Sequence, residues 1–350
     1  MTHLRIVAAT AALCVSVTVG GSAGGQSVAG FYTGKTITIS AATGAGATYG
    51  VHGRLLAETM KKYIPGNPNI VPQNMRGGGS IKAANYIYNV AAKNGAVFAA
   101  VFNTLPFAPI VGKKGPKFDI HKMAWIGSIG KHQNICATWH TSKTKTLQDA
   151  QNMETIVAGT GATSNAAVYP RLLNQTLGTK FKVVLGYKSS GAKLAVTNGE
   201  VAGICGTSYQ TLLASAPTWF SENKLNIIAQ IGLKPHPDLK GAPMVIDMIT
   251  DKAQKDLLTF LMLPQDMGRP YTAAPGLPKA RLAALRNAFA ATMKDPKFLV
   301  DAKRTRLIVE PISHTAMTAL VTRMSKMSKS TINSAAKLLV KKKKKKKKKS

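Results

Sequence analysis

Gly44-Ala45-Gly46-Ala47-Thr48 follows an apolar run at Ile37–Ser40, and Gly159-Thr160-Gly161-Ala162-Thr163 follows a second apolar run at Thr155–Ala158. Each turn precedes a stretch that reads as a helix. A strand that ends in a glycine-rich turn and opens a helix leaves free backbone N–H groups at the positive end of the helix dipole, and such groups hold anions. Two of these turns, far apart in the chain, predict two lobes that each present an anion-binding edge.

The N-terminus has the pattern of a secretory signal. His3 and Arg5 form a short basic start, Ile6–Val19 is apolar, and Gly21-Ser22-Ala23 supplies small residues for cleavage. The alternative, a buried N-terminal helix, is disfavoured because the run has no polar face. We therefore expect a signal peptide over 1–23 and an exported, unanchored product. The full chain of 350 residues is long enough for roughly two domains.

The charge balance is strongly basic, with a formal net charge of +33 from 47 Lys and Arg against 14 Asp and Glu. Lys341–Lys349 lies in a segment, 337–350, that we expect to be a disordered lysine-rich tail without assigned function. The first acidic residue is Glu58, so the first glycine-rich turn has no carboxylate near it in sequence. This suits an anionic ligand, although a generally basic surface explains most of the excess. Nucleic acid is not the expected partner.

Two cysteines remain after signal cleavage, Cys136 and Cys205. In an oxidising compartment they can pair, but the sequence equally allows two buried free thiols. No C-x-x-C motif occurs, so a redox or zinc site has little support. We expect neither a metal nor a cofactor.

Strands and helices alternate in both halves of the chain. The expected first-lobe strands are Lys35–Ala42, Asn69–Asn74 and Ala96–Phe102, separated by helices at Tyr49–Tyr63 and Ile81–Ala92. The second lobe repeats the order with expected strands at Thr155–Ala158, Lys182–Leu185 and Val201–Cys205. Arg269–Tyr271 is expected to be a strand that returns to the first lobe, and Pro311–Lys329 a terminal helix. This alternation is typical of an α/β fold with mostly parallel sheets flanked by helices.

Catalytic and nucleotide-binding motifs are not found. A dinucleotide fingerprint fails because Gly50 comes one residue late and because the second strand ends at Gln73-Asn74 without an acid. No G-x-x-x-x-G-K-[ST], H-E-x-x-H or G-x-S-x-G occurs. A hydrolase or a dehydrogenase is therefore the lowest-ranked hypothesis, and we expect that the protein is not an enzyme.

The predicted ligand-binding residues lie in the two turns and at neighbouring strand ends. In the first lobe they are Gly44, Ala45, Gly46, Ala47, Thr48, Tyr49, Gly78, Ser80, Asn103 and Thr104. In the second lobe they are Gly161, Ala162, Thr163, Ser164, Asn165, Tyr187 and Thr207. Hydroxyl groups at helix starts are also common helix caps, so each one alone is explained by capping. The repeated pattern favours a ligand for the set.

An ordered series of short motifs resembles the periplasmic solute receptors of tripartite tricarboxylate transporters. The resemblance runs from about Gly34 to His314, and no single motif is specific. In the first half it includes Arg54-Leu55-Leu56-Ala57, Ile64-Pro65-Gly66-Asn67-Pro68 and Ala83-Ala84-Asn85-Tyr86. In the second half it includes Gly199-Glu200-Val201, Gly268-Arg269-Pro270-Tyr271 and Lys294-Asp295-Pro296. The chain departs from the family at Gly50, where members usually carry an acid, and at Asn94-Gly95, where members often have Asp-Gly.

The resemblance implies a two-lobed flytrap of the periplasmic binding protein type II class, with a hinge between the lobes. Lobe 1 would comprise 30–130 and 244–330, and lobe 2 would comprise 131–243. Such receptors hold a ligand carboxylate through backbone N–H groups, hydroxyls and water. We thus expect a periplasmic receptor that captures a small organic carboxylate and delivers it to membrane permease subunits. The alternative is a flytrap-fold sensor or adhesion module that binds polyanions through its basic surface.

Overall fold

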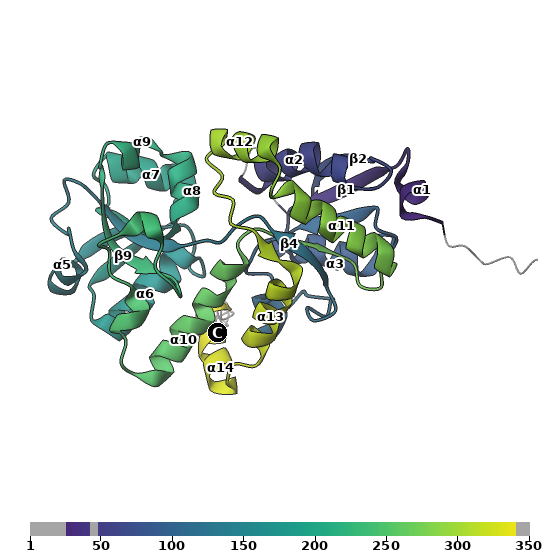
Figure 1. Ribbon diagram of the computed structural model, residues 1–350. Helices are drawn as coiled ribbons and strands as arrows, with labels where there is room; N and C mark the ends of the chain where they lie inside the picture. The colour runs from purple at the N-terminus through teal and green to yellow at the C-terminus, as the bar shows by residue number, and fades with distance from the viewer. Residues whose placement is uncertain (1–25, 43–47, 341–350) are drawn as a thin grey trace, which may run out of the picture.

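The computed structural model describes residues 26–42 and 48–340. The expected signal peptide, the first glycine-rich turn at Gly44–Ala47 and the lysine run Lys341–Lys349 lie outside this part of the chain. Figure 1 shows two lobes side by side, each built around one sheet and covered by helices. The two-lobed α/β architecture predicted from the sequence is therefore confirmed.

One sheet forms the centre of each lobe. The first sheet has the order β11 (Ile312–Ser313), β4 (Ala124–Ser128), β10 (Pro270–Ala273), β3 (Val97–Ala100), β1 (Thr36–Ala41) and β2 (Asn69–Asn74). The second sheet has the order β7 (Phe181–Leu185), β6 (Thr155–Gly159), β8 (Gly203–Ser208), β5 (Asn134–Trp139) and β9 (Leu225–Ile231). The parallel β-α-β portions match the strands predicted in both halves.

Both sheets are mixed, and most strands of each run in the same direction, so the prediction of mostly parallel sheets is confirmed. In the first sheet β10 runs antiparallel to β3 and β4, and in the second sheet β5 runs antiparallel to β8 and β9. The reason lies in the two crossovers between the lobes. β5 follows β4 directly through residues 129–133, so it enters the second sheet from the edge at which the parallel strands end. β10 re-enters the first sheet after the longer segment 232–269, which returns the chain from β9.

Alternating strand residues place hydrophobic side chains on both faces of the first sheet. Phe98 packs into the cluster under one face, and its neighbour Ala99 packs into the cluster under the other. The first face is covered by α2 (Thr48–Met60), α11 (Lys279–Thr292) and α12 (Pro296–Arg304). The second is covered by α3 (Ile81–Asn89) and α13 (His314–Ser325). The short helices of this lobe are α1 (Val28–Tyr32) and α4 (Phe107–Ile110).

The second sheet is covered in the same way. α6 (Asn165–Leu177) packs on one face, and α7 (Ser189–Thr197) and α8 (Tyr209–Ser215) pack on the other. Two shorter helices complete the lobe, α5 (Leu147–Asn152) and α9 (Thr218–Ser221). The 3₁₀ turns are η1 (Lys61–Tyr63), η2 (Gly78–Ser80), η3 (Pro237–Leu239), η4 (Val245–Met248) and η5 (Leu263–Met267). Within the described ranges, no helix is both long and apolar enough to span a bilayer.

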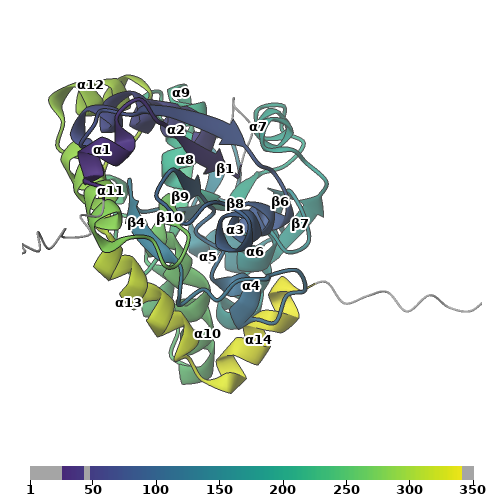
Figure 2. The ribbon, with the colours of Figure 1, turned by 90° about the vertical axis from the view of Figure 1, so that its right-hand side faces the viewer.

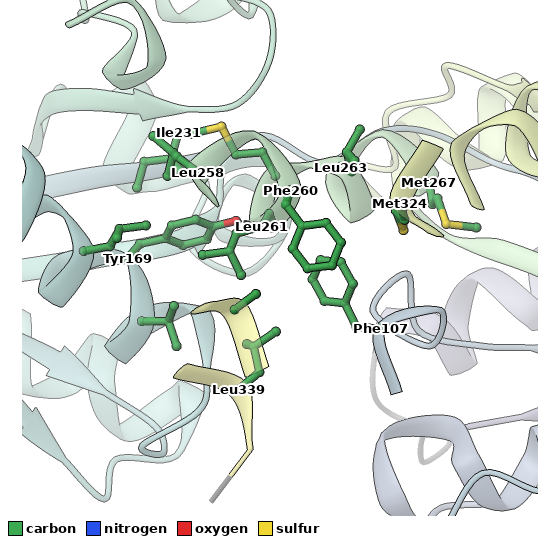
Figure 3. Packing of buried hydrophobic residues seen from close by; sticks show 14 of the residues in the cluster. Phe107, Tyr169, Ile231, Leu258, Phe260, Leu261, Leu263, Met267, Met324 and Leu339 are labelled. Atoms are coloured by element: carbon green, nitrogen blue, oxygen red, sulfur yellow. Dashed lines mark hydrogen bonds between the residues drawn. The ribbon is translucent and has the colours of Figure 1, made fainter. Parts of the chain in front are cut away.

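Two helices join the lobes at their base. α10 (Lys252–Met262) packs against α14 (Lys329–Leu339), and Figure 2 shows both beside α13 at the bottom of the molecule. The rings of Phe107 and Phe260 stack with their centroids 4.7 Å apart, linking α4 to α10 (Figure 3). One hydrophobic cluster thus runs from the first lobe through α10 and α14 to α6. α14 includes Lys337–Leu339, which the sequence predicts to be part of the lysine-rich tail.

A disulfide joins Cys136 of β5 to Cys205 of β8. The two residues are register partners on adjacent antiparallel strands. The bond decides between the two alternatives that the sequence left open. It ties the crossover strand β5 to the parallel part of the second sheet.

Candidate functional site

A cavity of about 650 Å³ lies where strand ends and connecting segments of the two sheets meet. The first lobe contributes Asn103 and Thr104, which follow β3. The first crossover contributes His132 and Asn134. The second lobe contributes Thr160, Thr163, Ser164, Asn165, Ala166, Gly206, Thr207 and neighbouring residues of α7 and α8. Six predicted ligand-binding residues are therefore brought together here: Asn103, Thr104, Thr163, Ser164, Asn165 and Thr207.

The second glycine-rich turn forms one wall of the cavity. β6 ends at Gly159, where a Cβ would stand 2.7 Å from Val183 Cγ1 and would displace that side chain. The Ser164 hydroxyl donates to the Gly161 carbonyl oxygen at 2.7 Å and makes no capping hydrogen bond to α6. The helix therefore begins at the cavity without a side-chain cap, which leaves its first N–H groups for another acceptor. Gly161 and Ala162 belong to this turn but do not line the cavity.

Close packing brings β8 to the start of α6. Gly206 has φ +81°, and a Cβ at this position would overlap the backbone of Asn165. Only glycine fits both the left-handed conformation and the contact. The approach places Thr207, the next residue of β8, in the same cavity wall as Asn165.

A smaller pocket of about 80 Å³ adjoins the main cavity. The two share the lining residues Asn103, Thr104, Thr163, Asn165 and Gln265. Lys113 also lines the smaller pocket, and its half-buried ammonium has no acidic partner among the described residues. Burial lowers the pKa of Lys113 below its usual value. This pocket, here called the side pocket, therefore offers an uncompensated positive charge.

The lining of both cavities is electrostatically one-sided. Lys193 lines the main cavity, where its ammonium donates to the Ser215 carbonyl oxygen at 2.8 Å, and Lys113 lines the side pocket. No Asp or Glu belongs to either lining in the part of the chain that the structure describes. The other polar groups are hydroxyls, amides and an imidazole. Among the same described residues, no group of His, Cys, Asp and Glu is arranged to hold a metal ion.

Besides Gly161 and Ala162, four described residues predicted to bind the ligand lie outside the cavity lining. Tyr49 donates its hydroxyl to the Gly268 carbonyl oxygen at 3.1 Å, and burial raises its pKa to about 12. Ser80 accepts a hydrogen bond from the Phe102 N–H at 2.8 Å, which holds η2 against the end of β3. Gly78 is exposed in η2, and Tyr187 packs against the hydrophobic cluster of the second lobe. Gly44–Ala47 and the side chain of Thr48 lie outside the described residues.

Sequence reasoning missed the residues contributed by the connecting segments. His132 and Asn134 belong to a polar run, Lys131–Asn134, between two apolar strands, and this pattern was the available signal. Gln265 is buried in η5, where its Oε1 accepts from the Asn134 N–H at 2.9 Å and its Nε2 donates to the Tyr169 hydroxyl at 3.0 Å. The local sequence around Gln265 gives no sign of this role. Gln265 lies at the cavity because the chain passes back from the second lobe to the first at η5.

Comparison of the fold with solved structures finds two-lobed solute-binding proteins. A TctC solute-binding protein from Polaromonas superimposes with a TM-score of 0.65 over 87% of this chain and 99% of that chain, at 19% sequence identity. The periplasmic binding protein BugD gives a TM-score of 0.62 over 88% and 99%, at 16% identity. MatC from Rhodopseudomonas palustris, solved with bound malate, gives 0.60 over 86% and 99%, at 16% identity.

These similarities establish the fold as that of a periplasmic binding protein with two lobes. Comparison of the sequence with protein families finds no match. Comparison with curated proteins also finds none.

Proposed function

We propose that this protein is an exported receptor that captures a small organic carboxylate between its two lobes and delivers it to a membrane transporter. One observation carries the proposal: the cavity between the lobes offers hydroxyls, amides, the start of α6 and two lysines, but no carboxylate among the described lining residues. Such a lining stabilises a negative charge and disfavours a positive one.

The second glycine-rich turn and the side pocket would hold the ligand together. Thr163 and Asn165 line both cavities, so a ligand bound at the start of α6 would reach the side pocket and Lys113 without leaving this wall. The first turn, Gly44–Thr48, would close on the ligand from the opposite lobe. In this proposal lobe 1 comprises 30–130 and 244–330, lobe 2 comprises 131–243, and closure occurs about the two crossovers.

The transport role and the location are proposed from the fold and from the sequence resemblance together. The receptors with this fold include one with bound malate and another, from Rhodopseudomonas palustris, with adipate. We propose that the chain is a receptor of the tripartite tricarboxylate transporter type, with permease subunits as its partner. The signal pattern over 1–23 supports export to the periplasm.

A thermal-shift screen tests the ligand class. Mono-, di- and tricarboxylates, with and without aromatic rings, are compared with amino acids, sugars and metal ions on the mature chain. A ligand that binds only the folded state raises the melting temperature by mass action, by an amount that grows with its concentration. At least one carboxylate should produce this shift. A shift with a sugar, a metal ion or a cationic amine alone would contradict the proposal.

A matched pair of variants then tests the location of the site. Thr163→Leu places a bulky apolar side chain in the wall shared by both cavities, so it should weaken carboxylate binding at least about tenfold, because it displaces a donor and fills space. Thr318→Leu makes the same change at an exposed position of α13 and should leave binding unchanged. Equal affinity in both variants would place the ligand elsewhere.

A further inference from the structure

The two crossovers between the lobes meet at the starts of β5 and β10. A Cβ on Gly268 would overlap the carbonyl oxygen of Gly130, so the two segments are in direct backbone contact. The Arg269 N–H donates to the Ser128 hydroxyl at 2.8 Å, and the His132 N–H donates to the Gln265 carbonyl oxygen at 2.9 Å. These contacts hold Arg269 beside the segment that carries His132 into the cavity wall.

Arg269 is a buried cation without a counterion. Its exposed fraction is 2%, and its Nε and Nη1 are shielded from solvent with no hydrogen-bond partner. No Asp or Glu in the described ranges forms an ion pair with it. A guanidinium stays protonated at any ordinary pH, so its charge must be tolerated where it lies. An unpaired buried charge is strongly unfavourable, which makes this arrangement costly unless something neutralises it.

Unsatisfied nitrogen atoms gather around Arg269. Of the seven buried side-chain N or O atoms without a partner in the described residues, four belong to His52, His132 and Arg269. His132, whose Nε2 is unpaired, lines the main cavity. His52 lies in α2 and is only 3% exposed. Guanidinium donors and imidazole nitrogens left unpaired together indicate a site for a polar ligand.

The charge of this group rests on the guanidinium alone. Burial, followed by the charge of Arg269, lowers the pKa of His52 to about 3. Burial and Arg269 also hold the pKa of His132 well below its usual value. Both imidazoles are therefore neutral at neutral pH, and a neutral imidazole can donate one N–H bond. One fixed positive charge with neutral donors matches a single carboxylate group.

We propose that a carboxylate subsite lies behind the cavity wall at His132, in which the buried Arg269, which neither cavity lining includes, supplies the positive charge and His132 donates a hydrogen bond. This proposal rests on the proposed function, because the carboxylate is that of the captured solute. In this proposal the positive charge that binds the ligand comes from Arg269 in the crossover between the lobes. The glycine-rich turns contribute backbone N–H groups in addition. Since Arg269 directly precedes β10 and His132 precedes β5, a carboxylate bound between them would contact both crossovers at once and favour the closed arrangement of the lobes.

The closing experiment compares Arg269→Met with Arg286→Met. Arg286 is a partly buried arginine of α11 that donates to the Trp125 carbonyl oxygen, away from the hinge. Binding of the best carboxylate from the screen is measured by calorimetry, and the melting temperature of the ligand-free protein is measured in parallel. Arg269→Met should weaken binding roughly ten- to a hundredfold, as expected for loss of a charged hydrogen-bonding partner. It should also raise the ligand-free melting temperature, because the unpaired charge is gone.

The two readouts separate the subsite from a structural role. If Arg269 only supported the fold, its replacement would lower the ligand-free melting temperature and leave the affinity of the folded fraction unchanged. His132→Leu changes a partly exposed residue of the cavity wall and should also weaken carboxylate binding. This variant provides a second affinity measurement if Arg269→Met does not fold. Unchanged affinity in His132→Leu and in folded Arg269→Met would overturn the subsite while leaving the proposed receptor function intact.

Two further arms test the identity of the anion. Chloride, nitrate and sulfate are titrated against the wild type and against Arg269→Met. If an inorganic anion stabilises the wild type through Arg269 but does not compete with the carboxylate, the site belongs to that ion and the assignment to the solute is overturned. Competition between the two supports it. If no carboxylate binds the wild type at all, the proposed function fails and the subsite fails with it.

Discussion

The carbonyl oxygen of Gly130 occupies the place where a side chain of Gly268 would stand. These two residues belong to the two segments that pass between the lobes, so their contact fixes how the crossovers lie against each other. Gly268 also has φ +56°, a conformation that residues with a Cβ adopt at a cost. The hinge is therefore built around a position that accepts only glycine.

Gly268→Ala should strongly destabilise the protein. The added Cβ combines backbone strain with direct overlap, so we expect a loss of more than about 3 kcal/mol in the free energy of unfolding, or no folded protein. Gly276→Ala is the control, because Gly276 has φ +77° but no atom within 4 Å of an added Cβ. It should cost only about 1 kcal/mol. Denaturant unfolding checks both, and equal losses would show that the contact with Gly130 yields readily.

Lys113→Met should reduce carboxylate affinity while leaving stability nearly unchanged. The change removes the uncompensated ammonium of the side pocket and keeps most of the side-chain volume. We expect a loss of about tenfold for acids with two carboxylates and a smaller loss for the monocarboxylates of equal length. Calorimetry across matched pairs from succinate to suberate measures the difference.

The control for this change is Lys114→Met, since Lys114 is exposed and lines neither cavity. A similar loss in Lys114→Met would mean that general surface charge, and not the side pocket, attracts the ligand. If mono- and dicarboxylates lost the same affinity in Lys113→Met, Lys113 would not bind the second carboxylate of the ligand.

Asp295 should contribute to stability in a pH-dependent way. Its buried carboxylate accepts from the Tyr63 hydroxyl at 2.7 Å and from the Phe298 N–H at 2.8 Å, and it pairs with Lys62. The hydrogen bond with Lys62, followed by those with Tyr63 and Phe298, holds the pKa of Asp295 well below its usual range. Because the folded-state pKa lies below the unfolded value of about 3.9, the stabilisation is complete above that value and is lost as the pH falls toward the folded-state pKa.

Asp295→Asn tests this contribution. The amide keeps an acceptor for the start of α12 but loses the charge, so the melting temperature should fall at pH 7 and by a somewhat smaller amount at pH 3, where only part of the stabilisation has been lost. Asp256→Asn removes an exposed ion pair with Lys252 and serves as the control, with little change at either pH. An equal effect of Asp295→Asn at both values would show that its role does not depend on the charge.

The disulfide between Cys136 and Cys205 should stabilise the second lobe. It closes a loop with a sequence separation of 69 residues, so the double change Cys136→Ala and Cys205→Ala should lower the free energy of unfolding by about 2–4 kcal/mol. Reduction of the wild type should produce a similar loss, measured by denaturant unfolding with and without dithiothreitol. If neither treatment changes stability, the cross-link does not constrain the unfolded chain.

The local sequence was sufficient for most of the framework. Alternation of β-branched strands with amphipathic helices placed β1, β2, β3, β6 and β7 close to their observed bounds. The glycine-rich word at Gly159–Thr163 correctly marked a strand end that opens a helix beside a cavity. These features follow from short-range periodicity and backbone conformation, which each segment carries by itself.

Only the tertiary structure decided the direction of β5 and β10, the pairing of Cys136 with Cys205, and the composition of the hinge. An antiparallel strand inside a parallel sheet has the same local pattern as its neighbours, because its direction depends on where the chain enters. Arg269, His132 and Lys113 read as ordinary polar residues in the sequence. Their burial and their lack of partners arise from segments more than a hundred residues apart, and no local pattern records such contacts.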